Sequence, residues 1–155
     1  MIRIGILGDI GSGKSYIAKL FGYPVFNADD EVNKLYNDNS RVFNKLKKIF
    51  PKYFSSFPIK KNTVIKAILD KPNNLKKIVK IIHFEIKKEM NLFLKKNKKK
   101  KIVILDIPLL LENKINKKKD ILIFIRADKN DTLKRLKKRK NFNKKLLNKF
   151  KKIQL

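Results

Sequence analysis

Residues 8–15 of the chain read Gly8-Asp9-Ile10-Gly11-Ser12-Gly13-Lys14-Ser15. This stretch matches G-x-x-x-x-G-K-[ST], the pattern of a phosphate-binding loop. It follows a short apolar run at residues 2–7 that predicts a buried strand, and it precedes residues 15–21, which have the composition of a helix. Strand, loop and helix in this order are the context that the motif requires. We therefore prefer a phosphate site to a glycine-rich turn that serves only the fold.

The residue types in this loop suit the triphosphate of ATP. Glycines let successive backbone N–H groups curl around phosphate oxygens, and the helix that follows directs its positive end at the anion. Lys14 is expected to reach the β- and γ-phosphates, and the Ser15 hydroxyl to ligate Mg²⁺. The expected ATP-binding residues are Gly8, Asp9, Ile10, Gly11, Ser12, Gly13, Lys14, Ser15 and Tyr16.

Three more apolar runs predict strands, at residues 25–26, 102–105 and 121–125. Helices are expected between them, at residues 30–36, 42–50, 63–69, 75–93, 130–138 and 143–153. Strands that alternate with helices predict an α/β chain with a central parallel sheet covered on both faces, a three-layer fold of the P-loop NTPase type. The helical stretch of about residues 30–97 exceeds a normal crossover, so we expect an inserted helical subdomain within one domain of residues 1–155.

The formal net charge of +28 would suit a polyanionic partner, either nucleic acid, an anionic membrane or a phosphorylated small molecule. The alternative is codon bias, because nearly all the basic residues are lysine and arginine, which nucleic-acid readers favour, is not enriched. We prefer the bias and expect no specific nucleic-acid partner. The chain has no long apolar run, so we expect no membrane span. It has no cysteine, so we expect no disulfide framework. A cytoplasmic protein is the simplest expectation.

Two acids follow predicted strands. Asp29 comes just after the strand at residues 25–26, at the sheet edge where α/β proteins bind ligands, and could accept the proton of an acceptor hydroxyl. It could equally cap the helix that begins at Asp30. Asp106 ends the strand at residues 102–105, where it could help to organise Mg²⁺ or serve as a turn residue.

Arg135 and Arg139 are four residues apart and therefore share one face of a predicted helix. Two guanidinium groups on one face suit a lid, expected at about residues 128–150, that neutralises the charge of a transferring phosphoryl group. They could also be two solvated residues on a basic helix. His83 lies in an apolar helical pattern that favours a core or capping role over a ligand.

Taken together, these residues resemble the dephospho-CoA kinase family along nearly the whole chain. The strongest match is Asp106-Ile107-Pro108-Leu109-Leu110-Leu111-Glu112, which is similar to the family's D-x-P-L-L-[FL]-E. The family's D-A-D triplet appears as Asn27-Ala28-Asp29, which keeps the final acid.

The resemblance implies a kinase that transfers the γ-phosphoryl group of Mg·ATP to the 3′-hydroxyl of dephospho-CoA. It implies Asp29 as the base, Arg135 and Arg139 in the lid, and the helical insertion as the acceptor-binding subdomain. A kinase for another nucleotide or small alcohol is the alternative that the phosphate loop alone permits. A non-catalytic nucleic-acid-binding protein is the alternative suggested by charge.

The chain departs from the family pattern in four places. Asp9 replaces the usual second glycine, Tyr16 stands where threonine is common, and Phe84 follows His83 where proline is usual. The sequence also stops at Leu155, where related chains continue into another strand, part of the adenine pocket and a closing helix. From this we expect an exposed apolar strand at residues 121–125, self-association and weak discrimination between ATP and GTP.

Overall fold

A computed structural model of the chain describes residues 1–107, 116–138 and 143–151. It divides into two compact units. Unit 1 contains Met1–Ala28 and Phe93–Leu155, and unit 2 contains Asp29–Leu92. Two helices cross the boundary in sequence, since α2 (Ala28–Asp38) begins in unit 1 and α5 (Asn74–Lys96) ends in it.

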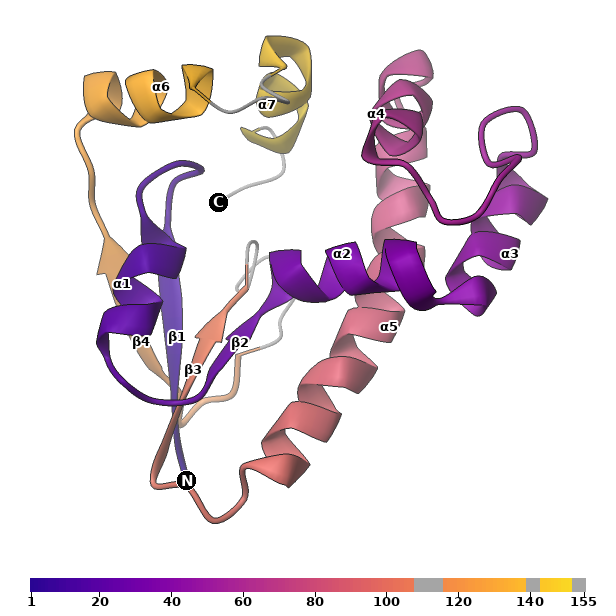
Figure 1. Cartoon of the computed structure of the whole chain (residues 1–155). Coiled ribbons are helices and arrows are strands. Elements are labelled where there is room, and N and C mark those ends of the chain that lie inside the picture. The colour runs from indigo at the N-terminus through magenta and orange to yellow at the C-terminus, as the bar shows by residue number, and fades with distance from the viewer. Residues whose placement is uncertain (108–115, 139–142, 152–155) are drawn as a thin grey trace. The chain divides into compact units, whose positions relative to one another are not determined.

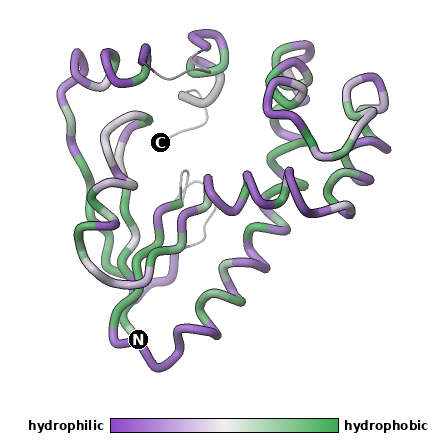
Figure 2. Tube along the Cα trace, in the orientation of Figure 1, coloured by the Kyte–Doolittle hydropathy of each residue, from purple (hydrophilic) through white to green (hydrophobic). Residues whose placement is uncertain are grey.

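A four-stranded sheet forms the centre of unit 1, and all its strands are parallel (Figure 1). Its strands are β1 (Ile2–Gly8), β2 (Val25–Asn27), β3 (Ile102–Asp106) and β4 (Ile121–Ile125), in the order β2-β3-β1-β4. The predicted α/β class with a parallel sheet is confirmed. Each of the four strands lies where an apolar run predicted it (Figure 2). Apolar runs of this kind are typical of the strands of parallel sheets.

Helices cover both faces of this sheet. On one face α1 (Lys14–Leu20) inserts the fully buried Ala18 against Ile4, Ile6 and Ile104. On the other face the Phe26 ring lies 5.6 Å from that of Phe93, in the last turns of α5. The sheet is therefore the middle layer of three within unit 1, as the fold prediction requires.

A buried ion pair lies at the end of the sheet opposite to the phosphate loop. The Arg3 guanidinium forms an ion pair of 2.9 Å with Asp120, just before β4, and the two side chains are only 8% and 4% exposed. The backbone N–H of Lys117 also donates to the Asp120 carboxylate, at 2.8 Å. This buried pair links the beginning of β1 to the beginning of β4.

Strand β4 lies at one end of the sheet order, and in the part of the chain that the structure describes it pairs with β1 alone. Its side chains Ile121, Leu122 and Phe124 are exposed, Phe124 to 63%. In the described residues, β4 is thus the apolar edge strand that the sequence predicts.

Unit 2 is helical. It contains most of α2 and α5, together with α3 (Ser40–Ile49) and α4 (Lys61–Asp70). Its core holds Val42 and Leu46 from α3, Ala67 from α4 and Ile82 from α5. Asparagine side chains form hydrogen bonds with backbone groups near the ends of two of its helices. Asn39 caps α3 by accepting from the Val42 N–H at 3.0 Å. Near the end of α4, the Ala67 carbonyl accepts from the Asn74 amide at 2.7 Å.

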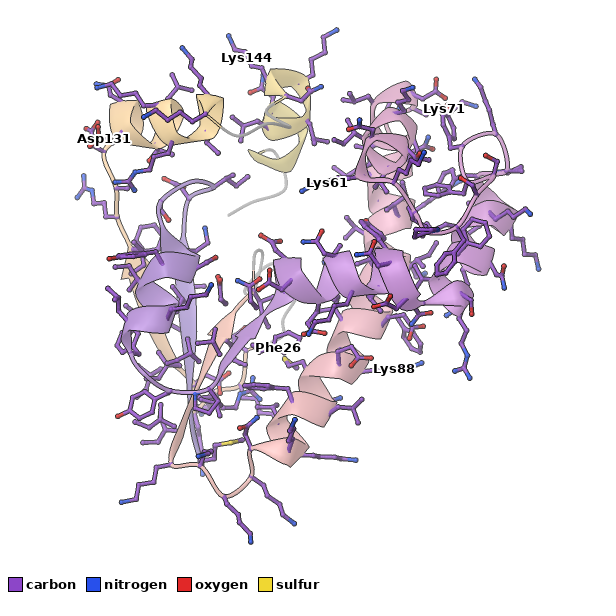
Figure 3. The ribbon with its side chains drawn as sticks, in the orientation of Figure 1. Phe26, Lys61, Lys71, Lys88, Asp131 and Lys144 are labelled. Carbon is purple, nitrogen blue, oxygen red and sulfur yellow. The ribbon has the colours of Figure 1, made fainter. Side chains whose placement is uncertain are left out.

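A cluster of charges joins α3 to α5 inside unit 2. Glu85, whose side chain is 8% exposed, accepts from Lys45 at 2.9 Å and from Lys88 at 3.2 Å. Both ammonium groups also lie over the Phe84 ring, and Figure 3 shows Lys88 on the outside of α5. Burial alone would raise the pKa of Glu85, but the hydrogen bonds from the two lysines outweigh it and lower that pKa.

The carboxyl-terminal part of the described chain holds α6 (Lys129–Lys137) and α7 (Lys144–Lys151). Asp128 caps α6 by accepting from the Asn130 and Asp131 N–H groups at 2.8 and 3.2 Å. Across residues 1–107, 116–138 and 143–151, no helix is both long and apolar enough to cross a membrane.

Candidate active site

The predicted phosphate loop joins β1 to α1 at the carboxyl end of the sheet. Two of its residues, Gly11 and Gly13, have φ of +88° and +96°, a left-handed conformation that favours glycine. Gly13 is also the N-cap residue just before α1, and its carbonyl accepts from the N–H groups of Tyr16 and Ile17, both at 3.1 Å. Glycine therefore stands at two loop positions whose backbone conformation other residues rarely adopt.

Lys14 folds back over its own loop. Its ammonium group donates to the Gly8 and Asp9 carbonyls, each at 2.7 Å. The positive charge is thus held at the loop within reach of any phosphate that binds there. The Asp9 carbonyl also accepts from the Ser12 N–H at 3.1 Å, and Ser12 itself is 5% exposed.

The first turn of α1 presents the remaining predicted nucleotide ligands. Ser15 and Tyr16 are both exposed, Tyr16 to 68%, and Ile10 is half-buried in the loop. An exposed hydroxyl at the beginning of the helix is available to a metal ion or to a phosphate oxygen.

A hydrogen bond that sequence analysis missed joins the carboxyl ends of two neighbouring strands. The Asn27 amide, at the end of β2, donates to Asp106 at the end of β3 at 2.7 Å. The two residues are register partners in the parallel pair. Asp106 is only 3% exposed, so its carboxylate is oriented inside unit 1 rather than solvated.

Asp106 and Ser15 offer the donors that a magnesium ion prefers. Mg²⁺ takes oxygen ligands, and in kinases one or two protein side chains usually hold it together with substrate phosphates. A serine hydroxyl at the phosphate loop and an oriented carboxylate at the carboxyl end of β3 fit that chemistry. Within the described residues no group of three or more His, Cys, Asp or Glu side chains could hold a metal by itself.

Asp29 lies inside α2, as its second residue, and is exposed. The alternative prediction, that Asp29 caps a helix beginning at Asp30, is wrong. The helix begins two residues earlier, at Ala28, so Asp29 lies within it. Three acids fill the first turn of α2, Asp29, Asp30 and Glu31, where the helix dipole favours negative charge. Asp29 follows the end of β2 by two residues.

Arg135 lies on α6 next to the phosphate loop. A Cβ atom placed on Gly13 would be 3.5 Å from its Nη1 atom. The structure thus brings together two predicted parts of the site that are far apart in sequence. Arg139 and the Pro108–Glu112 part of the family motif lie outside the described residues. His83 is half-buried on α5 in unit 2.

Known proteins match this chain over its length. A family model described as dephospho-CoA kinase matches residues 2–155. The dephospho-CoA kinase of Wolbachia sp. subsp. Brugia malayi is 36% identical over 157 residues, which cover 98% of this chain and 80% of that protein. The dephospho-CoA kinase of Zymomonas mobilis is 33% identical over 82% of this chain and 66% of its own length.

A solved structure shares the fold. The crystal structure of TT1252 from Thermus thermophilus superposes with a TM-score of 0.73 at 24% identity, and the match covers 99% of this chain and 80% of that one. The resemblance inferred from the residues is confirmed by the family model and by these relatives. The chain belongs to the dephospho-CoA kinase family.

Proposed function

We propose that this chain transfers the γ-phosphoryl group of ATP to the 3′-hydroxyl of dephospho-CoA and releases coenzyme A and ADP. The observation that carries the proposal is the family match over residues 2–155, together with a G-x-x-x-x-G-K-S loop between β1 and α1 in which Gly11 and Gly13 have left-handed φ. Phosphoryl transfer leaves little covalent chemistry to a protein, so its residues act by positioning and by charge.

In this proposal the phosphate loop holds the β- and γ-phosphates of ATP. Its backbone N–H groups surround the oxygens, and Lys14 exchanges its bonds to the Gly8 and Asp9 carbonyls for bonds to phosphate. Ser15 and Asp106 would hold Mg²⁺, which supplies charge neutralisation at the phosphates. Arg135, supported by Arg139, stabilises the negative charge that spreads over the transferring group.

Asp29 is assigned to the acceptor. Its carboxylate accepts the proton of the ribose 3′-hydroxyl as that oxygen attacks the γ-phosphorus. The bond from the γ-phosphorus to the β–γ bridging oxygen breaks, ADP leaves with that electron pair, and the proton stays on Asp29 until solvent takes it. Its support is the match to the last acid of the family triplet and its place two residues after β2. Unit 2, residues 29–92, is proposed to bind the rest of the acceptor.

A coupled ADP-release assay with and without dephospho-CoA tests the function, and mass spectrometry of the product identifies coenzyme A. ADP release that depends on another alcohol and not on dephospho-CoA would favour the alternative kinase function. Absence of any acceptor-dependent turnover would contradict a kinase altogether.

Two variants separate the assigned roles. Lys14→Ala should weaken ATP binding as well as turnover, whereas Asp29→Asn should leave ATP affinity nearly intact and lower kcat by about 10²-fold or more. Lys19→Ala and Asp30→Asn are matched controls, because each changes an exposed residue of the same charge on the same helix. Equal turnover in Asp29→Asn and Asp30→Asn would remove Asp29 from the mechanism.

A further inference from the structure

Helix α6 packs closely against the phosphate loop at Gly11. A Cβ atom placed on Gly11 would be 2.9 Å from Cγ of Leu136 and 3.0 Å from Cγ2 of Thr132, which leaves no room for a side chain there. Leu136 is 4% exposed and is the one buried residue of α6. Figure 1 shows α6 beside the loop that connects β1 to α1.

All residues of α6 except Thr132 and Leu136 are exposed. The helix is mainly hydrophilic (Figure 2), and its other leucine, Leu133, is 42% exposed. Its beginning is stabilised separately, by the Asp128 cap and by the bond of 2.9 Å from the Thr132 N–H to the Asp128 carbonyl. The cap of α6 therefore involves no residue of the phosphate loop, and Leu136 is the buried residue that faces the loop.

The same contact determines where Arg135 lies. Thr132 and Leu136 are one helical turn apart and both face Gly11, which fixes the rotation of α6 about its axis. Arg135 is then turned by about 100° from Leu136, since an α-helix has 3.6 residues per turn. This rotation places its guanidinium beside Gly13, the residue before Lys14.

We propose that Leu136, assisted by Thr132, is a positioning residue for phosphoryl transfer. It docks α6 on Gly11 and thereby orients Arg135 toward the phosphates held by the loop. Glycine at position 11 then has two functions, since it adopts the left-handed φ and also admits the leucine. The inference rests on the proposed kinase function, because Arg135 acts only if a phosphoryl group is transferred there.

Kinetics of Leu136→Ala, with Leu133→Ala as the matched control on the same helix, test the role. Leu136→Ala should lower kcat about tenfold and change KM for ATP less than about threefold, because a misplaced charge is lost mainly from the transition state. Leu133→Ala should change either constant less than about twofold, and the conservative Leu136→Met should restore kcat to within about twofold of wild type.

A double-mutant cycle distinguishes positioning from general stability. If Leu136 acts through Arg135, then adding Leu136→Ala to Arg135→Ala should lower kcat by less than about twofold further. Losses that multiply in full in the double variant would overturn the proposal, as would an unchanged kcat in Leu136→Ala.

Hydrogen exchange supplies a test that needs no turnover. Amide exchange over residues 8–15 should be faster in Leu136→Ala than in wild type and in Leu133→Ala, because α6 then covers the loop less of the time. Unchanged exchange would show that Leu136 does not hold α6 on the loop and would overturn the proposal. If wild type instead fails to phosphorylate dephospho-CoA while exchange responds as expected, the proposed function is wrong and the docking contact is correct.

Discussion

Replacing Asp120 by asparagine tests how strongly buried charge stabilises the sheet that carries the phosphate loop. The substitution keeps the shape of the side chain and an oxygen that can accept from the Lys117 N–H, but it removes the countercharge of Arg3. Arg3 would then stay ionised in a site where it is only 8% exposed. Removing one partner of a buried ion pair in this way costs about 3–5 kcal/mol.

A loss of that size is large for one domain, whose free energy of unfolding is about 5–15 kcal/mol in total. Because each kcal/mol shifts Tm by about 2–4 °C at this chain length, Tm should fall by about 6–20 °C. Urea unfolding followed by circular dichroism measures the free energy directly, and a thermal scan measures Tm.

Glu31→Gln is the control, because Glu31 pairs with Lys34 at 2.7 Å on the surface, with Lys34 66% exposed. Its loss should be about 0–1 kcal/mol. The double variant Arg3→Met/Asp120→Leu, which replaces both charges by apolar groups, should recover most of the stability that Asp120→Asn loses. If Asp120→Asn is no more destabilising than Glu31→Gln, the assignment of a structural role to this buried pair is wrong.

Three further outcomes are expected. The pKa of Glu85 is lowered in the folded chain. The contribution of its ion pairs to stability is therefore complete above the ordinary glutamate pKa and is lost as the pH falls through the folded pKa. The urea midpoint should accordingly depend less on pH in Glu85→Gln than in wild type. Binding to random duplex DNA should be weak and vanish at moderate salt, and tight sequence-selective binding in a filter or anisotropy assay would support a nucleic-acid function instead. Phe124→Lys should reduce self-association of this 155-residue chain in size-exclusion chromatography, because it places a charge on the exposed edge strand β4; a chain that is already monomeric would contradict this.

The sequence predicted each part of the fold that depends on local patterns. The four strands are short apolar runs, and the phosphate loop is a contiguous motif, so both could be located from neighbouring residues alone. The order of the strands depends on pairing between distant segments, which local periodicity does not encode. Since β2 and β3 were not known to be neighbours, the bond between Asn27 and Asp106 could not be predicted.

Two other contacts involve residues whose type differs from that of most of their neighbours in sequence. Arg3 interrupts an apolar strand, and a charge in a buried strand requires a partner, which the structure identifies as Asp120. Leu136 is an apolar residue in a strongly basic helix, and the structure shows it against Gly11. For Arg3 the exception to the local pattern marked a contact between distant segments, whereas the pattern alone does not separate Leu136 from the exposed Leu133 of the same helix. The helix start at Ala28 was missed for a different reason, because helix boundaries are less well determined by sequence than helix cores.

The substitution of Asp9 for the family's usual second glycine can now be understood from the conformation of the loop. The loop uses the backbone of residue 9, whose carbonyl accepts from the Lys14 ammonium at 2.7 Å and from the Ser12 N–H at 3.1 Å. The Asp9 side chain is exposed and takes no part in either bond. The position that α6 crowds is Gly11, and glycine is present there. Aspartate at residue 9 therefore changes the electrostatics of the loop rather than its conformation, and because the carboxylate is exposed, salt screens its repulsion of a bound phosphate.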